Sequence, residues 1–267
     1  MKGDLHMHSY YSDGFYSPAV VMEKARDAGC EIVALTDHDT IDGVAQAREA
    51  ALRLGMRYVT GVELSAYEGT EVHILGYGVH CDNARFCDFI AAQKERRRAR
   101  ADKLLRNLAE RGMALSYERL RAPLRGELSR THIAAELVRE GYESDFHEAI
   151  RKWLHKGSPT FVPVEGVSPE AVIEEIHAAG GVAVLAHPVR LDMEPIARTA
   201  FIRRLAAAGL DGIEAVYKRS SRATVKAFRA LAAALGLFVT AGADYHGDRN
   251  EIIARPLSEP CMRRITE

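Results

Sequence analysis

GDLHMHSYYSDG, residues 3–14, opens the chain with a short apolar run that carries two histidines and is followed by an aspartate. Alternation along a β-strand places the side chains of His6 and His8 on one face, and Asp13 follows in the next loop. Two imidazoles and a carboxylate suit a divalent metal ion, whereas a pair of structural histidines is the ordinary alternative. The stretch therefore predicts a strand that ends at a metal site.

Six further short apolar runs follow along the chain, and helical segments separate most of them. Apolar runs rich in β-branched residues alternate with helical segments, a pattern typical of βαβ units and a parallel sheet. Pro18 and Pro169 each follow a serine, as at a capped helix start. A sevenfold or eightfold α/β barrel is the simplest fold. Its expected strands are residues 3–8, 31–36, 58–63, 72–77, 182–187, 212–217 and 238–244, and its expected helices are 18–28, 42–54, 169–179, 195–208 and 223–235.

Residues 83–157 break this rhythm, because they are helical, charged and without a convincing strand. Helical spacing runs over 89–111 and 129–140 and leads into 146–154. Residues 94–130 hold 12 Lys and Arg against 5 Asp and Glu, while the whole chain has a net charge of −1. Such a run is usually a solvated helix face, but it can also collect anions. We expect 1–82 and 158–267 to form the barrel, and 83–157 an inserted helical domain that caps the substrate.

Composition sets limits on the class of protein. The 267 residues are 47% hydrophobic and can bury a full core. No window approaches the roughly 18 apolar residues of a membrane span, and two histidines precede any signal-like run. The four cysteines form no CxxC pair, which argues against a zinc knuckle or a disulfide framework. We therefore expect a cytoplasmic protein without a membrane partner; the composition leaves the oligomeric state open.

Further candidate ligands stand at nearly every other expected strand end. In an α/β barrel these ends converge on one mouth. Imidazoles and carboxylates together suit manganese, zinc or iron, and enough are present for two or three ions that share a bridging carboxylate. We expect Asp37 to orient an imidazole and Asp39 to cap the helix that begins at Asp42. The nine candidate metal ligands are His6, His8, Asp13, His38, Glu63, His73, His187, Asp244 and His246.

Six motifs spread over the expected barrel resemble the polymerase and histidinol phosphatase (PHP) family. They are HMHSYYSDG (6–14), LTDHDTIDG (35–43), GVELSA (61–66), EVHILGY (71–77), LAHP (185–188) and GADYHG (242–247). The resemblance implies a metal-dependent phosphoesterase with a distorted (β/α)7 TIM-like barrel, up to three metal ions, and Glu63 as a bridge. The implied ligand sets are His6, His8, Glu63 and Asp244; Glu63, His73 and His187; and Asp13, His38 and His246.

The expected phosphate-binding residues lie on three separate segments. Ser129 and Arg130 begin a helix whose amides and guanidinium could hold a phosphate, and Lys156 lies in a loop. Both segments resemble the branch of the PHP family that includes nucleoside 3',5'-bisphosphate phosphatases and RNA-end exonucleases. Lys218 follows the sixth strand, where this sequence departs from many relatives. Alternatively, Arg130 pairs with a nearby glutamate and Lys156 is an exposed loop residue. We read His132 as a histidine packed in the core.

Together these features predict a phosphatase for nucleotide phosphate monoesters, above all nucleoside 3',5'-bisphosphates, with release of the 3'-phosphate by a metal-activated hydroxide. We expect Asp13, His38, His187 and His246 to be the catalytic residues. The main alternative is a 5'-3' exonuclease on short RNA or DNA ends, marked by a basic groove lined with aromatic residues. A histidinol-phosphate-type phosphatase and a non-catalytic metal module attached to a polymerase are further alternatives.

Overall fold

All seven predicted strands are present in the computed structural model, which describes residues 1–122, 124–163, 166–218, 220–247 and 251–266. One sheet runs in the order β7-β6-β5-β4-β3-β2-β1-β8, so an eighth, short strand lies beyond β1. The predicted α/β barrel is thereby confirmed. The strands are β1 (Lys2–Met7), β2 (Ile32–Leu35), β3 (Arg57–Tyr67), β4 (Glu71–Tyr77), β5 (Val182–Leu185), β6 (Gly212–Tyr217), β7 (Phe238–Gly242) and β8 (Arg255–Pro256).

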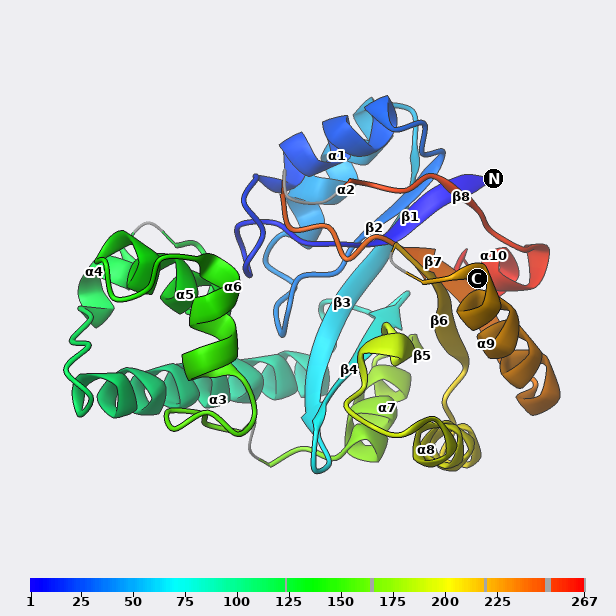
Figure 1. Cartoon of the computed structure of the whole chain (residues 1–267). Coiled ribbons are helices and arrows are strands. Elements are labelled where there is room, and N and C mark those ends of the chain that lie inside the picture. Colours follow the sequence, from blue (N-terminus) through cyan, green and yellow to red (C-terminus); the bar gives the residue numbers. More distant parts are fainter. Residues whose placement is uncertain (123, 164–165, 219, 248–250, 267) are drawn as a thin grey trace.

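The sheet curls until its two ends meet (Figure 1). Met7 at the end of β1 forms a parallel bridge with Tyr245, just after β7. The backbone N–H of His8 donates to the Tyr245 carbonyl at 2.8 Å, and Tyr245 N–H donates back to the His6 carbonyl at 3.2 Å. The barrel therefore closes between the first strand and the segment after the seventh, and both segments carry predicted ligands.

The direction of β4 differs from the prediction of a parallel sheet. β4 pairs antiparallel with β3 and with β5, and residues 68–70 join β3 to β4 without a helix. A tight turn can join only antiparallel strands, because a parallel crossover needs a dozen or more residues. The reversal brings the first half of β4 to the carboxyl end of β3, where His73 lies opposite Ser65. His73 thus reaches the mouth of the barrel from the start of its strand.

Helices cover the outside of the barrel, and the last one lies at the end of the barrel where β1 begins (Figure 1). Ser17 and Ser168 accept backbone N–H groups as N-caps, each before a proline, as predicted. The last helix was not predicted; it places Cys261 and Ile265 against the barrel interior with Leu5 and Tyr77. These elements are α1 (Pro18–Asp27), α2 (Val44–Arg53), α7 (Pro169–Ala178), the 3₁₀ turn η2 (Pro188–Arg190), α8 (Pro195–Ala207), α9 (Arg222–Leu235) and α10 (Glu259–Thr266).

The segment between β4 and α7 is helical in the residues that the structure describes and lies to one side of the barrel (Figure 1). Leu104, Leu108, Ile133, Leu137 and Leu154 are buried in a hydrophobic cluster of its own. The division of the chain into two domains stays a prediction. The helices are α3 (Ala84–Ala109), α4 (Tyr117–Arg121), α5 (Arg130–Arg139), α6 (Phe146–Ala149) and the π-helical turn η1 (Ile150–Leu154).

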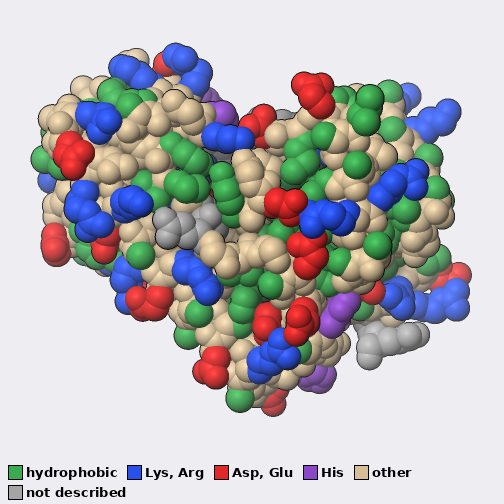
Figure 2. Space-filling view, turned by 90° about the horizontal axis from the view of Figure 1, so that it is seen from below, with side chains coloured by type: hydrophobic (Ala, Val, Ile, Leu, Met, Phe, Trp, Pro, Cys, Tyr) green, Lys and Arg blue, Asp and Glu red, His purple; other side chains and the backbone are tan. Residues whose placement is uncertain are grey.

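Much of the arginine in this segment is neutralised by neighbouring carboxylates. Arg119 and Arg139 pair with Glu140, and Arg98 pairs with Glu127. Figure 2 shows the same intermixing of cations and acids over the face seen from below. Among the described residues, no helix combines the length and the apolar character required to cross a membrane.

Candidate metal centre

Glu63 stands at the middle of the barrel mouth, fully buried in the carboxyl-terminal half of β3. One of its oxygens, Oε2, lies 3.2 Å from Nε2 of both His6 and His8 and 3.0 Å from Nδ1 of His38. The other, Oε1, lies 3.0 Å from His73 Nδ1 and 3.0 Å from His187 Nε2. Five imidazoles, two on β1 and β4 and three in the segments that follow β1, β2 and β5, therefore converge on one carboxylate, as the strand-end pattern predicts.

The remaining carboxylates extend this cluster in two directions. Asp244 Oδ1 lies 3.3 Å from His8 Nε2 and 3.7 Å from His6 Nε2. Asp13 Oδ1 lies 3.0 Å from His246 Nε2 and 3.9 Å from His38 Nε2. The structure thus brings all nine predicted ligands together at one mouth.

Three overlapping groups have ligand atoms that all lie within 4.8 Å of one another. One is the first set implied by the resemblance, and the second is the Asp13 set with His8 added. The third contains His38, Glu63 and His73, whereas the set implied by the resemblance has His187 instead of His38. His187 still approaches the Glu63 oxygen that faces His73. The groups are His6, His8, Glu63 and Asp244; His8, Asp13, His38 and His246; and His38, Glu63 and His73.

Solvent exposure defines the direction from which a substrate can enter. The side chains of His6, His8 and Glu63 are 0% exposed, while those of Asp13 and His246 are 8% and 24% exposed. His246 is the most exposed of the nine candidate ligands, so the side of the centre that it shares with Asp13 is its outer rim.

Several polar atoms of the centre are buried without a hydrogen-bond partner among the described residues. Leaving such atoms unpaired costs free energy, so they are rare in folded proteins. Imidazole nitrogens and carboxylate oxygens that converge in this way fit divalent metal ions as ligands. These atoms include His6 Nε2, His8 Nε2, His38 Nδ1, Glu63 Oε2 and Asp13 Oδ1.

The three carboxylates are held in their ionised form. Burial by itself would raise each pKa, but the surrounding imidazoles outweigh it. His246 makes the largest favourable contribution for Asp13 and Asp244, and His38 does so for Glu63. The pKa of each carboxyl group therefore lies well below its usual range, and all three are ionised at neutral pH.

The imidazoles divide into two kinds. Burial lowers the pKa of His38 and of His187, which favours their neutral form. Burial has the same tendency at His73 and His246, but the adjacent carboxylates outweigh it and raise each pKa to about 9. Neutral imidazole is the form that binds a metal ion.

Strained backbone is concentrated at the same mouth. Asp39, His187 and Asp244 are the non-glycine residues with positive φ among those described, at 50°, 27° and 51°. Each such residue costs on the order of 1–3 kcal/mol and persists where surrounding structure fixes it. All three directly follow or lie close after a barrel strand, and two of them, His187 and Asp244, are candidate ligands.

Glu214 supports two of the ligands and was missed from the sequence. It lies on β6, 1% exposed, with Oε1 3.0 Å from His6 Nδ1. Its Oε2 accepts the backbone N–H of His187 at 2.8 Å. The sequence feature that indicates this role is a single glutamate within the apolar run of β6.

Asp37 and Asp39 hold loops in place, which differs from the imidazole contact and the helix cap predicted for them. Asp37 accepts Ser9 Oγ at 2.7 Å and Ser12 Oγ at 2.6 Å, so it holds the loop that leads to Asp13. It reaches an imidazole only through Ser12, whose Oγ lies 3.5 Å from Nδ1 of His8.

The prediction that Asp39 caps a helix was wrong. α2 begins at Val44, and its N-cap position, Gly43, provides no side-chain bond. Asp39 instead accepts the Ser65 backbone N–H at 2.8 Å and pairs with Arg97 of α3. It therefore ties the helical segment to the mouth of the barrel.

The second oxygen of Asp244 is held by residues that sequence reasoning did not single out. Arg190 donates to Asp244 Oδ2 at 2.7 Å, and the Tyr217 hydroxyl donates to it at 3.2 Å. Lys218, a predicted phosphate-binding residue, donates to the Asp244 backbone carbonyl at 2.8 Å. These contacts place two cations directly beside a candidate ligand.

The other predicted phosphate-binding residues have protein partners. Arg130 pairs with Glu71 of β4, rather than with Glu127 or Glu136. Lys156 donates to the Gly69 carbonyl at 2.7 Å and is about half exposed.

Helix α5 begins beside the outer rim. Ser129 caps it by accepting the N–H of His132, and Thr131 Oγ1 lies 3.4 Å from Asp13 Oδ2. His132 is half-buried and completes a capping box through Nδ1. The predicted helix start therefore lies next to a candidate ligand, and Thr131 was missed.

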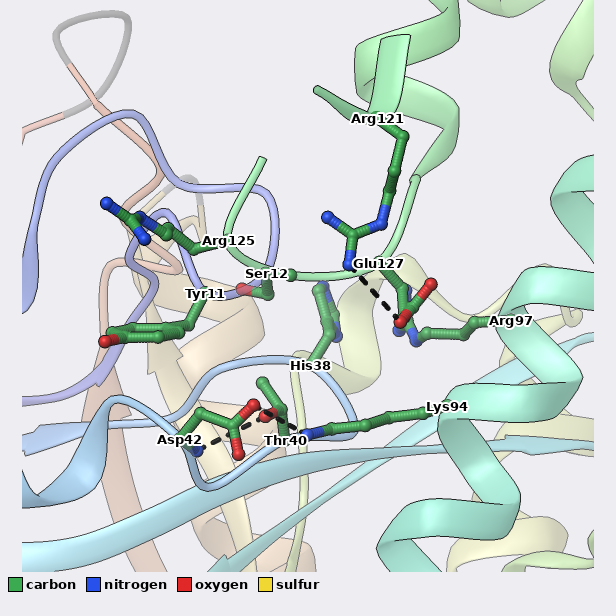
Figure 3. A pocket seen from close by; sticks show the side chains of 11 residues that line it. Tyr11, Ser12, His38, Thr40, Asp42, Lys94, Arg97, Arg121, Arg125 and Glu127 are labelled. Atoms are coloured by element: carbon green, nitrogen blue, oxygen red, sulfur yellow. Dashed lines mark hydrogen bonds and ion pairs between the residues drawn. The ribbon is translucent and has the colours of Figure 1, made fainter. Parts of the chain in front are cut away.

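A cavity of about 110 Å³ opens beside His38, between the barrel loops and the helical segment. Figure 3 shows Lys94, Arg97, Arg121 and Arg125 around it. Lys94 pairs with Asp42 and Arg121 lies near Glu127, so this wall is basic but partly neutralised.

Comparison with known proteins relates this geometry to characterised chains. Residues 4–160 match the PHP domain. A 5'-3' exoribonuclease of Haemophilus influenzae is 38% identical over 193 residues, or 72% of this chain and 70% of that one. A 3',5'-nucleoside bisphosphate phosphatase of Chromobacterium violaceum is 35% identical over 91% of this chain and 86% of its own length. A Bifidobacterium adolescentis structure described as a metal-dependent phosphoesterase has a TM-score of 0.86 at 28% identity, covering 98% of this chain and 94% of that one.

Proposed function

We propose, from the premise that the chain belongs to the PHP family and is a metal-dependent phosphoesterase, that it hydrolyses nucleoside 3',5'-bisphosphates and releases the 3'-phosphate. The observation that carries the proposal is the convergence of five imidazoles on Glu63, with Asp13 and Asp244 at either side. The bisphosphate phosphatase among the relatives covers most of this chain and supports the choice of substrate.

The charge of the centre supports a phosphate as its ligand. Three ionised carboxylates would be more than balanced by two divalent ions, so the loaded centre would attract an anion. The ions would be held by the three ligand groups described above. When bound, divalent ions stabilise negative charge on a phosphoryl group and lower the pKa of water toward neutrality. The proposed ions are manganese, zinc or iron, because imidazole and carboxylate ligands suit them.

Residues of the chain itself orient the substrate in this proposal. The reacting phosphate enters over the outer rim, where Asp13, His38 and His246 lie, with His187 on the opposite side of Glu63. We assign catalytic roles to Asp13, His38, His187 and His246, whereas Glu63 acts as a metal ligand.

Cations near the rim then neutralise the remaining negative charge of the substrate phosphates. Arg190 and Lys218 flank Asp244. Arg130 lies beside Glu71, whose Oε1 is 3.7 Å from His73 Nε2, and Lys156 borders the β3–β4 turn. Ser129 sets the start of α5, whose N-terminal end favours an anion. Basic groups on several segments suit a substrate that carries two phosphates.

A second candidate function is 5'-3' hydrolysis of short RNA ends. The Haemophilus influenzae relative bears that name and has the higher sequence identity over its shorter match. The two functions share a metal centre and differ in how much of a nucleotide chain the protein contacts outside it.

Phosphate release from three substrates tests the proposal. Adenosine 3',5'-bisphosphate, adenosine 5'-monophosphate and a short 5'-phosphorylated RNA are each incubated with protein and Mn²⁺, and products are separated by chromatography. We expect the bisphosphate to show the highest kcat/KM and to yield adenosine 5'-monophosphate. The Glu63→Gln variant, purified in parallel, controls for contaminating phosphatases. Release of phosphate at the level of this control from the bisphosphate would refute the proposed substrate.

A further inference from the structure

A second cavity, of about 430 Å³, lies beside the metal centre between β6, α9 and β8, and we call it the α9 cavity. Its polar lining consists of Lys218 and Ser220 after β6, of Arg222, Lys226 and Arg229 on α9, and of Arg255 on β8. No carboxylate belongs to the described lining. The cavity is therefore a concentration of positive charge of which the proposed phosphatase reaction uses Lys218 alone.

Four cations of the α9 cavity, unlike most of the other arginines, have no carboxylate partner within the described residues. Arg222, Lys226, Arg229 and Arg255 are exposed, and within the described ranges none of them forms an ion pair with a carboxylate. In the inserted helices, by contrast, arginines such as Arg98 pair with nearby glutamates. A protein surface normally intersperses both signs of charge. A row of unneutralised cations indicates a site for an anion.

The spacing on α9 arranges these charges in a line. Arg222, Lys226 and Arg229 follow at i, i+4 and i+7, which places them on one face of the helix. Like charges at this spacing destabilise a helix on their own. A ligand with regularly repeated negative charges removes that repulsion by contacting all three together. A single phosphate group can contact only one part of the row.

One end of the cavity adjoins the metal centre. Tyr217 and Lys218 line the cavity, and both also bind Asp244, through its Oδ2 and its carbonyl respectively. A chain whose terminal phosphate occupies the centre can therefore continue past these two residues toward α9. Figure 1 shows β6 and α9 side by side on the flank of the barrel opposite the inserted helices.

We propose that the α9 cavity binds the sugar–phosphate backbone of a single-stranded nucleic acid whose terminal nucleotide lies at the metal centre. The proposal rests on the proposed function in one respect, the presence of a nucleotide phosphate at that centre. Tyr217 is the lone aromatic residue in the described lining and is 7% exposed, so bases have no open ring on which to stack. Recognition is then of the backbone, independent of base sequence and sensitive to salt.

Binding and turnover of RNA by a triple variant test the proposal. R222Q/K226Q/R229Q removes three charges from α9 and leaves Lys218 in place. Its matched control is R26Q/R53Q/R203Q, which removes three charges from the exposed residues of α1, α2 and α8. The probe is a fluorescent single-stranded RNA with non-hydrolysable linkages, titrated at several salt concentrations in the presence of Mn²⁺. Adenosine 3',5'-bisphosphate hydrolysis is measured on the same preparations, and thermal melting verifies that each is folded.

We expect the α9 variant to bind the RNA at least tenfold more weakly, with a slope of log affinity against log salt smaller by about 2, since each phosphate contact contributes about 0.7. Its loss of kcat/KM should be at least tenfold greater for RNA than for the bisphosphate. Equal RNA binding by the α9 variant and the control would overturn the proposal, even if the bisphosphate is hydrolysed. Lack of bisphosphate hydrolysis with selective loss of RNA binding would support the cavity and refute the proposed substrate.

Discussion

Glu214 Oε1 lies 3.0 Å from His6 Nδ1, although the two residues are 208 positions apart in the sequence. The other oxygen of the same carboxylate accepts the backbone N–H of His187. One side chain on β6 therefore sets the ring orientation of a candidate ligand on β1 and the backbone of another after β5. Partners of this kind fix the tautomer of a ligating histidine and increase its basicity.

Glu214→Gln should weaken metal binding by about 10- to 100-fold, the range found for such outer partners. The amide can still accept a hydrogen bond but no longer carries the charge that supports His6. Metal affinity is measured by titration of chelator-treated protein, with Glu174→Gln on the exposed face of α7 as the matched control. Equal affinities in the two variants would show that Glu214 has no positioning role.

Glu63→Gln should lower both metal content and phosphate release by more than about 100-fold, since loss of a mere outer partner already costs 10- to 100-fold. The substitution preserves the shape of the side chain but removes the charge shared by five imidazoles. Elemental analysis of the purified variant gives the metal content. A variant with full metal content and activity would contradict the bridging role.

Removal of metal ions with a chelator should lower the melting temperature of the protein. Each ion present at about 100 times its Kd stabilises the folded state by about 2.7 kcal/mol. For a chain of this size, that corresponds to a shift of roughly 5–10 °C per ion. Thermal melts with and without Mn²⁺ measure it. The same melting temperature in both conditions would argue against ions at the Glu63 centre.

Arg97→Met should destabilise the protein by about 3 kcal/mol, because Asp39 is 1% exposed and would lose the charge that balances it. Arg98→Met is the matched control on the same helix; Arg98 is 44% exposed, and such surface pairs contribute about 0–1 kcal/mol. Urea unfolding of both variants gives the comparison. A cost for Arg97→Met no larger than that of the control would mean that the Asp39 contact does not anchor α3.

Thiol reagents should distinguish the cysteines by burial. Burial raises the pKa of Cys30 and of Cys261 to about 12, so at pH 8 only about one thiol in 10,000 is ionised. Their reaction should accelerate with rising pH toward 12, whereas the exposed Cys87 should react first at pH 8. Mass spectrometry of partially labelled native protein identifies the sites. Early labelling of Cys261 would contradict the packing of α10.

The sequence was sufficient for seven of the eight strands and for the assembly of the mouth, because convergence of strand ends follows from the topology of a barrel. Strand periodicity carries no information on direction, so β4 was assigned as parallel. The short link at residues 68–70 was the missed signal, since so few residues can join only antiparallel neighbours.

The contacts that sequence reasoning missed connect distant segments. Asp39 meets Arg97 across 58 positions, and Arg130 meets Glu71 across 59. No local pattern connects such partners, so the sequence predicts the nearest helix start as the contact of Asp39, and for Arg130 a phosphate or, alternatively, a nearby glutamate. Glu214 differs, because a charged residue inside an apolar strand is itself a signal for a buried role.

The pairing of Met7 with Tyr245 has a consequence for biosynthesis. His8 emerges from the ribosome long before Asp244 and His246, because most of the barrel lies between them in the sequence. A nascent chain therefore cannot complete the ligand shell until the segment after β7 has been made. Cofactor loading must follow synthesis of that segment, and truncation shortly before Asp244 should abolish it even if the earlier strands are intact.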